Sequence, residues 1–214
     1  MPSLVSSLGY GNRLLTLMGN DGLSVQAEEL FAVTTEQGFP FFRAQGMIDR
    51  GWNKVKKGDV AAGVSLLRSG SAAYRVTGAL AWVPYHTALL AIACGIAGEV
   101  KEALTLLDDA LELSGKRGER WLDAELNRQK GALLLRQGHI AAAEENYRKA
   151  HTIAREQNAK LWELRAATNL AGLYRDQRRR AEAHEVLAST YNWFTEGFET
   201  ADLREAKALL EELR

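Results

Sequence analysis

This chain has little of several residue types that mark particular kinds of protein. It has one cysteine, Cys94, in 214 residues, which excludes an internal disulfide and favours a reducing, cytoplasmic compartment. It has only three prolines, which suits a mainly helical chain. Lys plus Arg and Asp plus Glu each number 27, so the formal net charge is zero. This balance argues against nucleic acid or a membrane surface as the partner.

Long apolar runs are missing as well. No stretch approaches the ~20 apolar residues that a transmembrane helix needs. The N-terminus, MPSLVSSLGYGNR, lacks the charged start and the apolar centre of a signal peptide. It begins abruptly in a helical pattern, so we expect the chain to be a segment of a longer protein. Apolar residues still make up 46% of the chain, which is enough for a folded core.

Motifs for catalysis and for cofactor binding are missing too. The chain has neither GxxxxGK[ST] nor GxGxxG, so no phosphate-binding loop is expected. Its carboxylates lie in helical patterns on the expected solvent faces, and no Ser/His/Asp set stands out. The histidines share no metal-ligand spacing; they are His86, His139, His151 and His184. We therefore expect no catalysis, no cofactor and no metal.

What the chain does have is a constant period. Gly58, Gly98 and Gly138 lie 40 residues apart and begin the runs GDVA, GEVK and GHIA; RRRA from Arg178 continues the series. Glycine suits the left-handed position that follows a helix end. A fixed period indicates one small unit used repeatedly, and such units bury their apolar faces by stacking.

Small residues recur in the same register. Each expected first helix has one, and a second follows 12 residues later in the expected second helix. A large residue comes four positions after the second small one. Small residues at matched sites let two helices approach closely. The small pairs are Gly51/Gly63, Ala91/Ala103, Gly131/Ala143 and Ala171/Ala183, and the large residues are Leu67, Leu107, Tyr147 and Leu187.

This spacing, over roughly 41–191, resembles the tetratricopeptide repeat (TPR). The resemblance implies an all-α, TPR-like right-handed superhelical solenoid of antiparallel helix hairpins with a C-terminal capping helix. The unit is six residues longer than the usual 34, and we expect the extra length between one second helix and the next first helix. The aromatic residue early in the TPR pattern is replaced here by Met47, Thr87, Asn127 and Ala167.

The pattern places the helices as follows. We expect first helices over Phe41–Lys57, Pro84–Ala97, Arg120–Gln137 and Leu161–Gln177, and second helices over Val60–Arg75, Val100–Ser114, Ile140–Gln157 and Ala181–Phe194. The chain then forms a single domain, 1–214: a degenerate first hairpin over 1–40 (helices 4–18 and 24–37), repeats over 41–80, 81–120, 121–160 and 161–195, and a capping helix over 200–214. In the capping helix, Leu203, Leu209 and Leu210 should pack against Trp193 and Phe194.

The TPR resemblance also implies a partner-binding face, because first helices line the concave wall of such arrays. Its N-terminal half is aromatic and its C-terminal half carries arginines, which bind carboxylates in bidentate pairs. We therefore expect a protein or peptide partner with apolar and acidic groups. An alternative is that Trp52 and Tyr85 only pack between repeats and that Glu125 pairs with Arg128. The candidate residues are Gln45, Trp52, Tyr85, Arg128, Arg165, Thr168 and Arg175.

The densest basic run, Arg178 to Arg180, leaves two interpretations open. It can be a solvated turn, or it can contact an acidic partner or an RNA backbone.

One stretch carries a more specific resemblance. LWELRAATNLA from Leu161, YRDQ from Tyr174 and YNWFTEGFETADLREAKALL from Tyr191 are similar to the C-terminal TPR region of bacterial adenylate/guanylate cyclase-type or winged-helix STAND ATPase signalling proteins. GERWLDAELNRQKGALLL from Gly118 and EQGFPFFRAQG from Glu36 resemble the same family. That family has glycine where this chain has Arg178, so we expect the last hairpin turn to differ.

This resemblance implies a non-catalytic interaction or scaffold module, acting as the regulatory C-terminal arm of a multidomain signalling protein. Its partners would be another protein, the upstream domains of the same parent chain or a second copy. Two alternatives stay open: part of a purine nucleotide cyclase whose catalytic domain lies outside this chain, and a stand-alone TPR adaptor.

Overall fold

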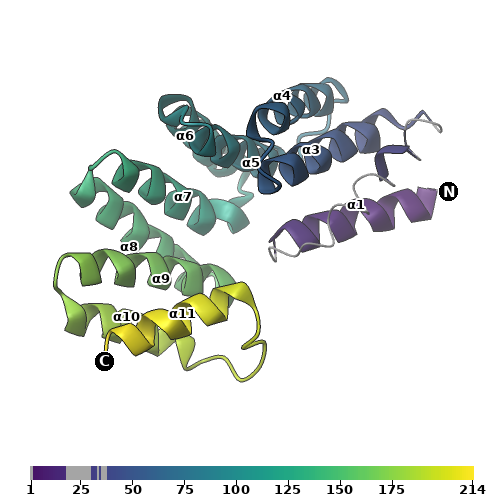
Figure 1. Ribbon diagram of the computed structural model, residues 1–214. Coiled ribbons are helices and arrows are strands. Elements are labelled where there is room, and N and C mark those ends of the chain that lie inside the picture. Colours follow the sequence, from purple (N-terminus) through teal and green to yellow (C-terminus); the bar gives the residue numbers. More distant parts are fainter. Residues whose placement is uncertain (1, 18–29, 33, 35–37) are drawn as a thin grey trace. The chain divides into compact units, whose positions relative to one another are not determined.

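The computed structural model describes residues 2–17, 30–32, 34 and 38–214, and the regular elements in these ranges are helices (Figure 1). None of the helices in these ranges is long and apolar enough to cross a bilayer. The expected helix over 4–18 corresponds to α1, whereas most of the expected helix over 24–37 lies outside the described residues. In chain order, the elements are α1 (Pro2–Leu17), α3 (Pro40–Lys56), α4 (Val60–Val76), α5 (Val83–Ile96), α6 (Val100–Arg117), η1 (Arg120–Leu122), α7 (Asp123–Arg136), α8 (Ile140–Glu156), α9 (Lys160–Asp176), α10 (Arg180–Tyr191) and α11 (Ala201–Glu212).

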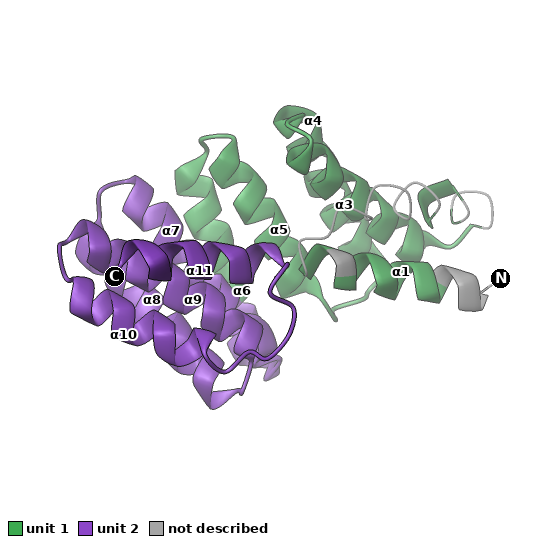
Figure 2. Cartoon of the chain, turned by 60° about the horizontal axis from the view of Figure 1, so that its bottom comes forward, with its two compact units in different colours: residues 1–110 green, residues 111–214 purple. Residues whose placement is uncertain are grey.

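The chain divides into two compact units, Met1–Ala110 and Leu111–Arg214 (Figure 2). In unit 1, α3 packs along α4, α1 lies against α3, and α5 contacts both α3 and α4. In unit 2, α7 pairs with α8 and α9 pairs with α10, while α11 packs on α9 and α10. The expected all-α hairpin architecture is therefore confirmed, and the arrangement as one continuous domain stays a prediction.

The extra length of the repeat lies inside the helices. α8 and α9 each have 17 residues, and only residues 157–159 separate them. The next turn, 177–179, is equally short. The expectation of extra length between hairpins is therefore wrong for this junction. The expected extra length between hairpins is found only before α5 and α7. These two first helices have 14 residues each, and longer connections precede them.

The turns confirm the glycine register and extend it. Gly58, Gly98 and Gly138 have φ values of 89°, 88° and 80°, and Arg178 takes φ 64° at the equivalent place. The last hairpin turn therefore keeps the conformation of the others, against our expectation. A second series with the same period follows α4, α6 and α8, and the sequence analysis did not identify it. Its members are Gly78, Gly118 and Asn158, all with positive φ, and Gly38, another 40 residues earlier, has positive φ too.

The helices of a hairpin approach closely where the sequence places small residues. A Cβ added to Gly63 would lie 2.8 Å from the carbonyl oxygen of Gly51, and one added to Gly131 would lie 2.7 Å from the Tyr147 ring. Ala103, Ala143 and Ala183 are fully buried. The small-residue register is thus confirmed by the contacts it was expected to make.

The C-terminal helix α11 covers the last hairpin. Leu203, Ala206 and Leu210 are buried in one cluster with residues of α9 and α10, and Leu209 and Phe194 pack against that cluster. Trp193 does not take part in the way we expected. Its exposed fraction is 58%, and its ring lies edge-on to Phe194. α11 therefore caps unit 2 without covering Trp193.

Candidate functional site

Three of the expected partner-binding residues lie in unit 1, and two of them are buried. The side-chain amide of Gln45 donates to the Gly9 carbonyl oxygen (2.6 Å) and accepts from Arg13 Nη2 (2.9 Å). Tyr85 has an exposed fraction of 3% and lies edge-on to Trp82, while Trp52 is partly buried. Gln45 and Tyr85 hold helices together in this structure, and their role in partner binding stays a prediction.

A buried polar cluster joins α1 to α3 in unit 1. Asn12 Nδ2 donates to Asp49 Oδ2 at 3.0 Å, and the Arg13 guanidinium lies 4.4 Å from the centre of the Trp82 ring. Burial raises the pKa of Asp49 to about 7, although Asn12 and Arg13 act in the opposite direction. Burial, together with the charges of Arg13 and Arg75, lowers the pKa of His86 to about 3. These groups serve the packing of α1 and offer no surface to a partner.

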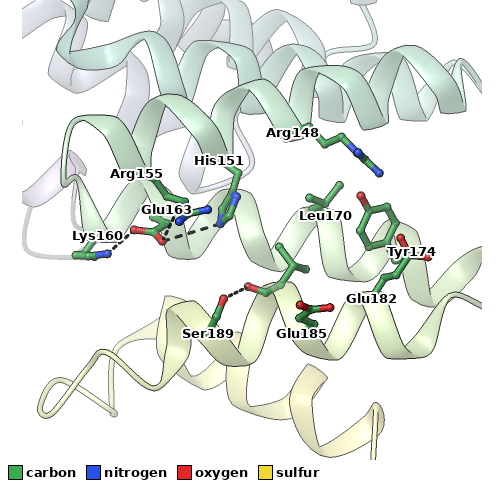
Figure 3. Close-up of a pocket in the computed structure, with 11 residues that line it drawn as sticks. Arg148, His151, Arg155, Lys160, Glu163, Leu170, Tyr174, Glu182, Glu185 and Ser189 are labelled. Carbon is green, nitrogen blue, oxygen red and sulfur yellow. Dashed lines mark hydrogen bonds and ion pairs between the residues drawn. The ribbon is translucent and has the colours of Figure 1, made fainter.

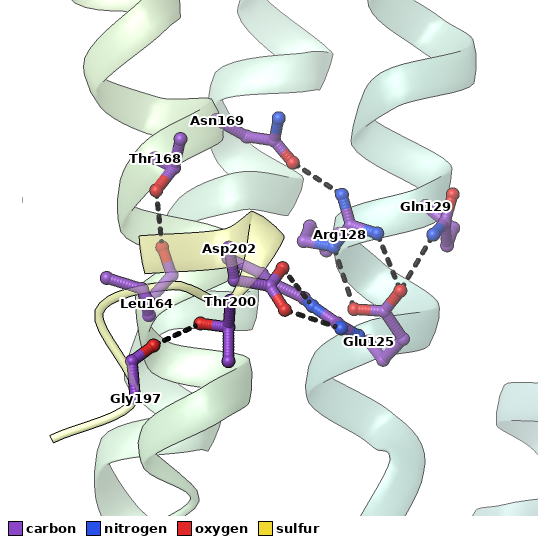
Figure 4. A network of polar contacts seen from close by, with 10 residues as sticks. Glu125, Arg128, Gln129, Leu164, Thr168, Asn169, Gly197, Thr200 and Asp202 are labelled. Atoms are coloured by element: carbon purple, nitrogen blue, oxygen red, sulfur yellow. Dashed lines mark hydrogen bonds and ion pairs between the residues drawn. The ribbon is translucent and has the colours of Figure 1, made fainter. Parts of the chain in front are cut away.

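Unit 2 brings the other four candidates together: Arg128 on α7 and Arg165, Thr168 and Arg175 on α9. We call the surface formed by α7, α9 and α11 the first-helix face. Arg128 donates to both carboxylate oxygens of Glu125 (2.6 and 2.7 Å) and to Asn169 Oδ1 (2.6 Å), as Figure 4 shows. Burial opposes both charges, yet their attraction lowers the pKa of Glu125 and raises that of Arg128. The pairing of Glu125 with Arg128 is thus confirmed.

The other two arginines are paired with the capping helix. Arg165 donates to both oxygens of Asp202, at 2.7 and 2.8 Å. Arg175 donates to Glu212 Oε2 at 2.8 Å and to Asp176 Oδ1 at 2.9 Å. The expected partner carboxylates are therefore found within the chain itself, and an acidic partner would have to displace them.

A groove lies between α9 and α11 on this face, with a volume of about 380 Å³. Gly172 forms part of its floor, and a Cβ added there would meet no neighbouring group within 4 Å in the described part of the chain. Thr168 and Arg175 line the groove as well, together with Leu135, Tyr147, Asn169, Leu173, Asp176, Glu205, Ala208, Leu209 and Glu212.

A second groove, of about 620 Å³, lies among α8, α9 and α10 (Figure 3). At one end it contains Glu163, a buried carboxylate that sequence reasoning missed because nothing local marks it as buried. Lys160 Nζ lies 2.7 Å from Glu163 Oε2, and the nearest nitrogens of His151 and Arg155 lie 4.0 Å from Oε1. Lys160 and Arg155 already face this carboxylate of the chain, so this groove is weaker than the α9/α11 groove as a partner site.

The basic run after α9 is largely engaged within the chain. The Arg179 guanidinium lies 3.8 Å from the centre of the Tyr174 ring and pairs with Glu144 and Glu182. Arg180 Nη2 donates to the Glu212 carbonyl oxygen, and Arg178 is exposed. The run therefore serves mainly to fix the last hairpin.

Cys94 is fully buried, as expected, and burial raises the pKa of its thiol to about 11. It lies near Glu99 and Glu102, and within the described ranges these three residues form the one group with the spacing of metal ligands. Arg68 Nη2 already lies 2.8 Å from each of the two carboxylates and 3.8 Å from Cys94 Sγ. The guanidinium of Arg68 therefore occupies the position that a metal ion would take.

Comparison with solved structures identifies the fold. The nearly identical TPR-like repeats of a kinesin light chain from Podosopora anserina superpose with a TM-score of 0.60 at 18% identity, covering 100% of this chain and 98% of that one. BtubC (BKLC) from P. vanneervenii gives 0.63 at 16% identity, covering 94% and 89%. The apo form of RapI gives 0.63 at 11% identity, covering 99% and 83%. The fold of this chain is therefore TPR-like.

Comparison by sequence is less informative. No family model matches the chain. An uncharacterized protein of Rhizobium meliloti (strain 1021) is 27% identical over 130 residues, which make up 60% of this chain. The match spans only 13% of that relative, which is therefore far longer than this chain. None of these names indicates a cyclase or an ATPase.

Proposed function

We propose that this chain is a non-catalytic protein-interaction module and that the first-helix face of unit 2 binds a segment of a protein partner. The observation that carries the proposal is the open groove over Gly172 in a TPR-like fold. At about 380 Å³ it falls in the range of small ligand sites, which suits one or two side chains of a bound segment.

The expected residues have two different roles on this face. Thr168 and Arg175 line the groove and contact the bound segment. Arg128 holds α7 to α9 through Asn169, and Arg165 holds α9 to α11 through Asp202, so these two arginines shape the face. In unit 1, we propose that Trp52 offers a further contact, while Gln45 and Tyr85 support it from within.

The experiment compares wild type with Gly172→Met in a pull-down from a lysate of the source cells. Methionine fills the groove, and because glycine is a poor helix former, the substitution should keep or raise helix stability by up to ~1 kcal/mol. Gly115→Met is the matched control, because Gly115 also lies in a helix of unit 2 and also faces open space. Partners recovered by wild type and by Gly115→Met, but lost by Gly172→Met, support the proposal. Equal recovery by all three contradicts it.

We further propose that the chain works as the regulatory arm of a longer, multidomain signalling protein. The support is the far greater length of the Rhizobium relative and the resemblance of the segments from Leu161 onward. In that setting the groove binds another domain of the same protein or a second copy. An antibody against this chain should detect a native polypeptide much larger than 23.6 kDa, whereas a band of that size favours a stand-alone adaptor.

A further inference from the structure

The α9/α11 groove has an acidic rim. Asp176, Glu205 and Glu212 line it, whereas Arg175 is the one arginine in the lining, and Arg180 outside the lining donates to the Glu212 carbonyl oxygen. The other two candidate arginines add no net charge, because Arg128 is paired with Glu125 and Arg165 with Asp202. The groove therefore carries more negative than positive charge, although the arginines dominate the sequence pattern.

The rim carboxylates are open to solvent. The side chains of Asp176 and Glu212 are 63% and 56% exposed while they bind Arg175, and Glu205 is exposed one turn before Ala208. A carboxylate has about four acceptor positions, so Glu212 can accept from a second cation without releasing the first. An incoming carboxylate would instead compete for Arg175 and face three like charges.

The walls below the rim are apolar. Leu135 and Leu209 are partly buried, and Leu173 and Tyr147 are buried beside them. The open space over Gly172 leaves room for a side chain that reaches these residues. Burying an apolar side chain there would stabilise a complex by roughly 25 cal/mol for each Å² removed from water.

We infer that this groove binds a protein segment in which a basic side chain lies next to a large apolar one. The inference rests on the proposed function and specifies the chemical character of the bound segment. The apolar side chain enters over Gly172, and the Lys or Arg pairs with Glu205 and Glu212 at the rim. This is the reverse of the acidic partner that the arginines predict from sequence alone.

The test is a selection of random phage-displayed peptides on the full chain, with peptides that also bind Gly172→Met removed. The enriched sequences should carry Lys or Arg within a few positions of Leu, Ile, Met or Phe. Synthetic versions should bind less tightly as salt rises, because exposed charge pairs are screened within ~8–10 Å near physiological ionic strength.

Charge reversal on α11 then tests the rim directly. Glu205→Lys should weaken the selected peptides roughly fivefold, in line with the modest strength of exposed ion pairs. Glu211→Lys makes the same charge change on the same helix but outside the groove lining, and it should leave the affinity unchanged.

The outcomes distinguish a failure of the basic-partner inference from a failure of the proposed function. Enrichment of acidic sequences, or equal effects of Glu205→Lys and Glu211→Lys, overturns the basic-partner inference and leaves the proposed function standing. Failure to enrich any peptide whose binding depends on Gly172 overturns both.

Discussion

At the residue scale, Arg178 is the clearest departure from the repeat. It has φ 64° where the equivalent turns use glycine, and its side chain is exposed. A side chain in the left-handed region costs about 1 kcal/mol relative to glycine. Arg178→Gly should therefore raise the free energy of unfolding by about that amount, and Gly138→Arg should lower it similarly. Urea denaturation measures both changes.

Arg178→Ala is the control for this prediction. Alanine keeps the Cβ and hence most of the strain, so its unfolding midpoint should stay close to that of wild type. If Arg178→Ala and Arg178→Gly stabilise equally, the gain comes from removing a charge and the argument from backbone strain is wrong.

Asp49 makes the stability of the chain depend on pH. Asn12 and Arg13 from α1 and Tyr85 from α5 interact with it. Its pKa is about 7 in the folded chain, against about 4 in an unfolded one. The folded state therefore holds an extra proton between these values, and the contribution of Asp49 to stability falls as pH rises from about 4 to 7.

His86 has the opposite effect on the pH dependence of stability. The pKa of His86 is about 3 in the folded chain and near 6.5 in an unfolded one, so its contribution to stability is lost as pH falls below about 6.5. The two effects offset one another between about pH 4 and 6.5, so wild type alone cannot separate them.

Asp49→Asn isolates the aspartate, because asparagine keeps an oxygen that can accept from Asn12. The stability of the variant relative to wild type should increase between pH 5 and pH 8. Urea midpoints at the two pH values measure this difference. A constant difference would mean that Asp49 titrates normally in the folded chain.

At the element scale, the hairpins depend on small residues where their helices meet. Ala143 is fully buried, and its carbonyl oxygen would lie 3.1 Å from a Cβ on Gly131. Ala143→Leu should overpack this contact and cost about 1–3 kcal/mol. Ala141→Leu adds the same bulk at an exposed site of the same helix and should cost little. Equal shifts of the two denaturant midpoints would show that the crossing tolerates bulk.

The capping helix repeats the spacing that joins one first helix to the next. Arg165 bonds Asp202 and Arg175 bonds Glu212, each across 37 residues. Bonds between first helices have similar separations: Asn12 to Asp49 spans 37 residues and Arg128 to Asn169 spans 41. α11 therefore takes the place of the first helix of a further unit. This position explains why it brings carboxylates to the arginines of α9.

Much of the hairpin geometry could be predicted from sequence, because turns and helix crossings depend on local rules. The positive φ of Gly138 and the close contact at Gly131 follow from residue type and period. The charge of the groove could not be predicted in the same way. The arginines lie on first helices, as expected, but predicting which carboxylates they pair with requires knowing where α11 lies.

The burial of individual residues was the other property that could not be predicted from the sequence. Gln45 was expected at a surface, yet α1 covers it, and α1 belongs to a degenerate unit outside the strict register. Trp193 was expected in the core, yet it is exposed because α11 buries Leu203 and Leu210 against α9 and α10 instead. In both cases a neighbouring element decides the outcome, and the residue itself carries no sign of it.

At the scale of the whole molecule, the chain consists of two compact units, and the division falls inside α6. In repeat proteins, stability is approximately a sum over units and their nearest neighbours, so a part with its own core can fold alone. Unit 2 has such a core, in which α8, α9, α10 and α11 all contribute buried residues. We therefore expect residues 111–214 to form a folded, helical protein when expressed alone.

Because every residue that lines the α9/α11 groove lies in unit 2, this fragment should also retain the function proposed for that groove. Peptides selected on the full chain should bind residues 111–214 with an affinity within roughly threefold of their affinity for the full chain. When no contact is lost, the free energy of binding should change by less than about 1 kcal/mol. Circular dichroism checks the fold, and fluorescence polarisation checks the affinity. A folded fragment with much weaker binding would contradict the placement of the whole site in unit 2.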